Sequence, residues 1–121
     1  MPRLTWITTC KGRLEHLRHT LPRVVAQPDL ACVVVDFSCP DGTADWVQKH
    51  HPQVTVVEAA NEPGFSAPRA RNLGAAAART EWLGFFDADI LLAADFSTAV
   101  LPLLRPGAFF RPTPVTPHAG P

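Results

Sequence analysis

Four runs of apolar and β-branched residues alternate along the chain with segments whose apolar positions recur every three or four residues. Apolar runs of this length are typical of buried strands, whereas the longer spacing is typical of helices with one buried face. Strands are therefore predicted over residues 4–9, 30–35, 54–58 and 82–86. Helices are predicted over 14–26, from Asp41 or Thr43 as cap to about 49, and over 67–79.

This alternation of strands and helices predicts the fold class. Repeated strand-helix units with right-handed crossovers build an open, mostly parallel α/β sheet of Rossmann-like type, with helices on both faces. Because the run 82–86 carries no charge, we expect that strand to be covered on both faces. Pro22 removes a backbone donor, so we expect the first helix to kink or restart there.

The last quarter of the chain has a different composition. Residues 97–104 predict a short helix, and six of the 13 prolines fall between 102 and 121. Proline supports neither a packed helix nor a regular ladder. We expect an α/β domain over residues 1–104 and a Pro-rich tail over 105–121, with one possible edge strand at 107–111.

Composition narrows the function classes. A length of 121 residues fits one domain, and 11 basic against 11 acidic residues leave no net charge to attract nucleic acid or a membrane surface. No apolar run reaches the length of a transmembrane segment and no signal peptide is evident, so the expected location is cytoplasmic. Cys10, Cys32 and Cys39 lack metal-ligand spacing, which favours buried, reduced thiols.

Acidic residues follow two of the predicted strands. Asp36 ends the second strand, and Asp87 and Asp89 end the fourth. Carboxyl ends of parallel strands border one crevice, so we expect these acids to converge there. Two close carboxylates repel unless a cation lies between them, and Mg²⁺ or Mn²⁺ is often shared by carboxylates and substrate phosphates. The alternative is that Asp87 caps the next segment and Asp89 is a solvated loop acid.

Basic residues begin the third predicted helix. Arg69, Arg71 and Asn72 lie in its first two turns, and a helix N-terminus with arginines favours anions. The loop after the first strand, residues 10–13, has one glycine and therefore lacks a dinucleotide fingerprint. A diphosphate would instead be neutralised by a divalent ion at Asp89 with help from Arg71.

Four motifs, in order, resemble those of family 2 glycosyltransferases of the GT-A fold. They are Thr8–Arg13, Val33–Asp36 followed by Asp41–Thr43, Ala70–Gly74 and Phe85–Asp89. The resemblance spans about residues 4–96. It implies a GT-A sheet that is truncated after the D-x-D strand, because the acceptor-binding half of the family, with its usual catalytic base, lies further downstream.

The resemblance implies metal-dependent transfer of a sugar from a nucleoside diphosphate sugar, UDP-type as the first guess, to an unknown acceptor. The residues implied are Thr8, Thr9 and Asp36 around the nucleobase, Arg71 and Asn72 near the nucleotide, Asp87 at the ribose or sugar and beside the metal, and Asp89 on Mg²⁺ or Mn²⁺.

The chain also departs from the family pattern. Phe37 and Cys39-Pro40 replace small polar residues, which leaves the choice of base open, and only Asp95 and His118 stand near as candidate catalytic bases. The alternatives are a non-catalytic binding or assembly module and a nucleotidyltransferase-like domain. Uncovered sheet edges invite pairing with another chain, so we expect self-association as a homo-oligomer.

Overall fold

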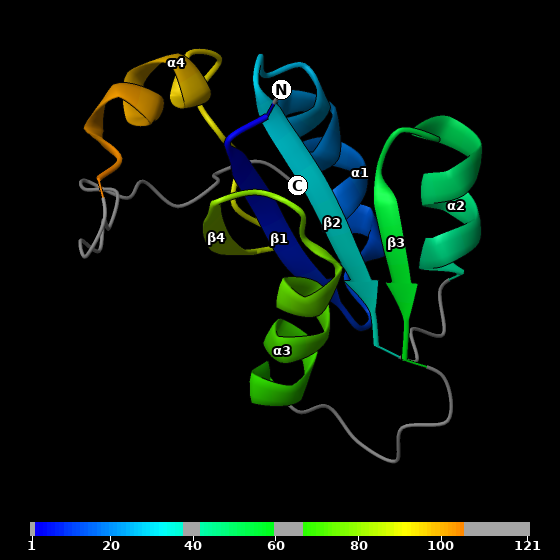
Figure 1. The fold of residues 1–121 in the computed structure, drawn as a ribbon. Coiled ribbons are helices and arrows are strands. Elements are labelled where there is room, and N and C mark those ends of the chain that lie inside the picture. The colour runs from blue at the N-terminus through cyan, green and yellow to red at the C-terminus, as the bar shows by residue number, and fades with distance from the viewer. Residues whose placement is uncertain (1, 38–41, 60–66, 106–121) are drawn as a thin grey trace.

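Four parallel strands form one open sheet in the computed structural model, which describes residues 2–37, 42–59 and 67–105 (Figure 1). The strands are β1 (Leu4–Cys10), β2 (Leu30–Asp36), β3 (Thr55–Glu58) and β4 (Trp82–Asp87). Their order is β3-β2-β1-β4, and every neighbouring pair is parallel. The predicted α/β class is confirmed, and the order reverses direction at β1, so that β2 and β4 flank it.

A helix follows each strand. These are α1 (Leu14–Val25), α2 (Thr43–His50), α3 (Ala67–Ala77) and α4 (Phe96–Val100), the last of which continues into a 3-10 turn at Leu101–Leu103. Within the described ranges, no helix is both long enough and apolar enough to cross a membrane. The possible strand at 107–111 and the predicted tail lie outside the described residues.

Two hydrophobic cores lie on the two faces of the sheet. Successive strand residues point to opposite faces, so Trp6 of β1 packs with α1 and α2 while Ile7 packs with α3. Leu17 and Leu21 of α1 cover the first face, and Ala70 of α3 lies against the second. Figure 1 shows the same layering, with α3 on one side of the sheet and α1 and α2 on the other.

Helix α3 lies unusually close to the sheet at Gly74. A Cβ atom built there would overlap Cγ2 of Ile7 and would lie 3.2 Å from Cγ2 of Val35. Because both neighbours are buried and β-branched, they have little freedom to move aside. The absence of a side chain at residue 74 therefore sets the distance between α3 and the strands beneath it.

The apolar sequence of strand β4 predicted that both of its faces are covered, but one face is partly exposed. Its residues alternate in exposure, and Leu83 and Phe85 are 40% and 45% exposed. Helix α3 packs mainly over β1 and β2, and β4 is one of the two edge strands in the described part of the sheet. The prediction was wrong because an uninterrupted apolar run does not reveal whether a second layer reaches the strand.

Pro22 does not restart the first helix. Helix α1 runs without interruption from Leu14 to Val25, and the N–H of Ala26 still donates to the carbonyl of Pro22. Pro22 is exposed and lies in the last turn, where its missing N–H removes one backbone hydrogen bond without ending the helix. The predicted restart is therefore wrong.

The described cysteines are buried thiols. Cys10 and Cys32 are both free, as predicted, and Cys39 lies outside the described residues. Burial raises the pKa of the Cys32 thiol far above its ordinary value. Cys32 is therefore a packing residue rather than a nucleophile.

Candidate functional site

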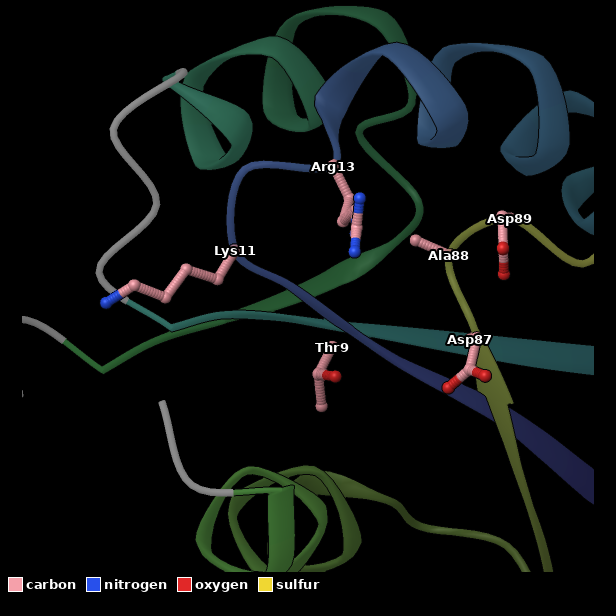
Figure 2. A pocket seen from close by; sticks show the side chains of 6 residues that line it. All are labelled: Thr9, Lys11, Arg13, Asp87, Ala88 and Asp89. Atoms are coloured by element: carbon pink, nitrogen blue, oxygen red, sulfur yellow. The ribbon is translucent and has the colours of Figure 1, made fainter. Parts of the chain in front are cut away.

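An open cleft lies where β1 and β4 end. Its volume is about 420 Å³. Its lining residues come from the last part of β1, the loop into α1 and the turn after β4: Thr9, Lys11, Arg13, Asp87, Ala88 and Asp89 (Figure 2). This is the edge at which parallel α/β sheets place their ligands.

The turn after β4 presents both acids to the cleft. The side chain of Ala88, between them, is buried in the α1 core, whereas Asp87 and Asp89 are exposed. The N–H of Ile90 donates to the carbonyl of Asp87 at 3.1 Å and closes the turn. In the described residues neither carboxylate accepts a hydrogen bond, so the alternative role of Asp87 as a cap finds no support there.

Two cations line the same cleft as the acids. Arg13 immediately precedes α1, and Figure 2 shows its guanidinium pointing into the cleft, whereas the side chain of Lys11, further along the loop, extends away from the two acids. The loop turns at Gly12, whose φ is 69°. Within the described residues, no ion pair joins either cation to Asp87 or Asp89. The cleft therefore holds opposite charges that leave space between them for a ligand.

Lys11 and Arg13 belong to the motif Thr8–Arg13, but nothing in the sequence pattern assigned them a role. The signal that could have identified them is their position. They follow β1 directly, and β1 lies beside the D-x-D strand, with Thr9 in register with Asp87. Residues just past the carboxyl end of a strand next to an acidic strand end border the same crevice.

Asp36 does not line this cleft. It is buried, and its Oδ2 accepts a hydrogen bond from the N–H of Ala44 at 3.1 Å, in the first turn of α2. The side-chain acceptor at the start of α2, which was expected from Asp41 or Thr43, is therefore supplied by Asp36. Thr43 is the first residue of α2 rather than its cap, and Asp41 lies outside the described residues.

Three other predicted residues also lie outside the cleft lining. Thr8 is fully buried beneath α1, and its hydroxyl has no hydrogen-bond partner in the described residues. Arg71 and Asn72 are exposed on α3. Of the residues singled out from the sequence, the structure brings together Thr9, Asp87 and Asp89.

The chemistry of the acidic turn fits a divalent cation that is shared with a ligand. Asp87 and Asp89 offer exposed carboxylate oxygens, the ligands that Mg²⁺ and Mn²⁺ prefer. In the described part of the chain, no cluster of three or more acidic, histidine or cysteine side chains could enclose a metal. The remaining coordination positions would therefore belong to phosphate oxygens and water.

Solved structures share this fold. TarS from S. aureus (residues 1–349) aligns with a TM-score of 0.74 and 19% identity, over 83% of this chain and 31% of TarS. The same protein has been solved with UDP-GlcNAc, with a TM-score of 0.73 at 19% identity over 83% of this chain and 30% of that one. The mannosyltransferase PcManGT from Pyrobaculum calidifontis, solved with GDP-Man and Mn²⁺, aligns with a TM-score of 0.70 and 29% identity. The alignment covers 87% of this chain and 33% of PcManGT.

The chain thus spans about a third of the length of these structures. No curated protein matches it at a significant level in sequence. A family model does match: glycosyl transferase family 2 aligns with residues 5–108, which include the whole cleft lining and all of the sheet except Leu4. The chain therefore belongs to glycosyl transferase family 2.

Proposed function

We propose that this chain binds a nucleoside diphosphate sugar together with Mg²⁺ or Mn²⁺, as the donor-binding part of a glycosyltransferase. The observation that carries the proposal is the cleft itself. Two carboxylates, Asp87 and Asp89, share its lining with two cations, Lys11 and Arg13, with no ion pair between them in the described residues. A metal-bound diphosphate has the charge pattern that complements such a surface.

Each side chain has a distinct role in this proposal. Asp89, with Asp87 beside it, would hold the metal, which supplies Lewis-acid stabilisation of the leaving diphosphate. Arg13 can donate two parallel hydrogen bonds to a phosphate, and Lys11 adds a second positive charge. Arg13 also precedes the first turn of α1, where unpaired N–H groups and the helix dipole favour anions. Thr9 offers a hydroxyl on the floor of the cleft.

The base and sugar of the donor are open to test. UDP-type donors are the first candidates, and TarS has been solved with UDP-GlcNAc, whereas PcManGT has been solved with GDP-Man. Arg71 and Asn72 are exposed in the middle of α3, a helix that begins at the edge where the strands end (Figure 1), and they remain candidates for contact with a nucleotide that extends from the cleft. Thr8 and Asp36 are buried, which makes them supports of the site rather than ligands.

Calorimetry tests donor binding directly. UDP, GDP and dTDP sugars are titrated into the chain with and without Mn²⁺, and we expect at least one to bind only when Mn²⁺ is present. Asp89→Asn should abolish this metal-dependent heat. Glu81→Gln is the matched control, because Glu81 is also exposed but precedes the opposite end of β4. Equal binding by the wild type and Asp89→Asn would refute the proposed metal site.

Transfer requires an acceptor and a general base besides the donor. Asp95, one of the two candidates, is exposed beside α4, and His118 lies outside the described residues. Metal-dependent release of sugar from the donor by the purified chain would support catalysis. Donor binding without turnover would favour the binding-module alternative. Membership of family 2 favours both over nucleotidyl transfer.

Three further expectations remain proposals. Residues 1–104 should form the folded unit, so a chain ending there should melt at the same temperature as the full chain.

Self-association is supported by the exposed Leu83 and Phe85 on edge strand β4, and light scattering at tens of micromolar tests it. The cytoplasmic location stays a prediction.

A further inference from the structure

Helix α1 and a residue just after it hold the segment that follows β4. Thr20 and Arg23 lie three residues apart on α1, on the same side of the helix, and Gln27 lies two residues beyond its last residue, Val25. Each donates a hydrogen bond to a backbone carbonyl between residues 88 and 93: Thr20 to Ala88, Arg23 to Leu92 and Gln27 to Ala93. The acidic turn and the chain after it are therefore attached at three points to α1 and to the residue that follows it closely.

The first of these contacts lies inside the acidic turn. The Oγ1 of Thr20 donates to the carbonyl of Ala88 at 2.7 Å, and Thr20 is only 1% exposed. A helical threonine can instead bond to a carbonyl of its own helix, so this donation across to another segment is a specific use of the hydroxyl. The side chain of Ala88 is buried as well, at 4% exposure. The spacer between the two acids is thus fixed by both its side chain and its carbonyl.

The last contact fixes the far end of the segment. Gln27 is buried, its Nε2 donates to the carbonyl of Ala93 at 2.7 Å, and its Oε1 accepts from the N–H of Ser97 at 3.0 Å. One amide therefore satisfies two backbone groups around the start of α4. Because this end is secured separately, loss of the Thr20 contact would release the acidic turn without releasing the whole segment.

We propose that Thr20 is a positioning residue that directs the carboxylates of Asp87 and Asp89 into the cleft. With the carbonyl of Ala88 held by α1, the backbone that carries Asp87 and Asp89 is fixed at the cleft. The expected loss of metal affinity rests on the proposed function. The expected loosening of the turn around Ala88 does not depend on it. Loss of groups that orient metal ligands typically weakens metal binding about tenfold to a hundredfold.

Three variants separate positioning from general stability. Thr20→Val keeps the shape of the side chain but removes the donor, and Thr20→Ser keeps the donor. Thr5→Val is the matched control, because Thr5 is equally buried and its hydroxyl is hydrogen-bonded to Thr80 at 2.6 Å, at the other end of β1. Two measurements are made on each: amide hydrogen exchange at Ile90, whose N–H closes the turn, and Mn²⁺ affinity by electron paramagnetic resonance.

We expect faster exchange at Ile90 and about tenfold weaker Mn²⁺ binding in Thr20→Val, with values near those of the wild type in Thr20→Ser and Thr5→Val. Unchanged exchange at Ile90 in Thr20→Val, or equal changes in Thr5→Val, would overturn the inference. If the wild type binds no Mn²⁺, the proposed function fails, and the exchange comparison alone decides the role of Thr20.

Discussion

Asp36 and Asp87 end the two strands that flank β1, yet their side chains leave opposite faces of the sheet. Asp36 is in register with Cys10 and Asp87 with Thr9, and consecutive residues of one strand point to opposite faces. Asp36 therefore lies on the face of α1 and α2, where it supports α2, while Asp87 borders the cleft. The two acids should respond differently to mutation.

Asp36→Ala should destabilise the fold and leave metal binding intact. It removes a buried acceptor from an N–H in the first turn of α2, and loss of such a cap costs about 1–2 kcal/mol. Urea denaturation measures the change. Asp87→Asn, at an exposed position, should leave the urea midpoint nearly unchanged and weaken Mn²⁺ binding. If both variants lost the same amount of stability and the same amount of Mn²⁺ affinity, the division between a structural Asp36 and a metal-binding Asp87 would be contradicted.

Arg13→Gln should weaken the binding of a nucleoside diphosphate about tenfold, because one charged pair of hydrogen bonds to phosphate is lost. Arg18→Gln, in the second turn of α1, is the control. Arg18 is paired with Glu15 at 3.1 Å and lies over the ring of Trp46, away from the cleft lining. Titrations at two ionic strengths should show a smaller salt dependence for Arg13→Gln than for the wild type. Equal losses in the two variants would argue against phosphate contact by Arg13.

Thr8→Val should be neutral or stabilising, by up to about 1 kcal/mol. The hydroxyl of Thr8 is buried without a partner in the described residues, and an unsatisfied buried polar group costs about 1–3 kcal/mol. Valine has nearly the same shape and removes this cost. Thr5→Val, which loses a hydrogen bond to Thr80, should destabilise in the same thermal melt. A clear drop in melting temperature for Thr8→Val would mean that the hydroxyl has a partner.

Gly74→Ala should destabilise the fold, although alanine favours helices by about 1 kcal/mol over glycine. The new methyl group would overlap the side chain of Ile7, and overpacking a core costs about 1–3 kcal/mol. A net loss of about 1 kcal/mol is expected from urea denaturation. Ala76→Gly, at an exposed position of the same helix, measures only the difference in helix propensity between alanine and glycine. If Gly74→Ala stabilises by that same difference, the close packing of α3 is refuted.

Stability should fall as the pH drops below the ordinary histidine pKa of about 6.5. Burial, and then the neighbouring His50, lower the pKa of His51. The unfolded chain then binds a proton at His51 more readily than the folded chain, so acid favours unfolding. Urea midpoints between pH 8 and pH 5.5 should decline less steeply in His51→Gln. His16→Gln, at an exposed position on α1, should follow the wild type.

The sequence predicted the elements and their order well, because hydrophobic spacing is a local signal. It predicted less well which face each side chain takes. Residues 30–35 are apolar without interruption, so the alternation that places Asp36 on the α1 side is hidden in the sequence. The half-exposed face of β4 was missed for the same reason, since Leu83 and Phe85 look like core residues until the reach of α3 is known.

The acidic turn was found from its position after a strand, but its counter-charges were not. Lys11 and Arg13 belong to another part of the chain, and only the pairing of β1 with β4 brings them to the same cleft. The hydrogen bond from Thr20 to Ala88 joins residues 68 positions apart. Local patterns do not report contacts of this kind.

The buried methyl group of Ala88 links the cleft edge of the molecule to its interior. Because the residue between the acids is itself a core residue, the backbone of the acidic turn stays in place while the interior stays packed and the Thr20 contact is made. Gentle warming should therefore leave the geometry of the acids intact until the interior melts, and the capacity to hold a cation should vanish in that same cooperative transition rather than fade before it.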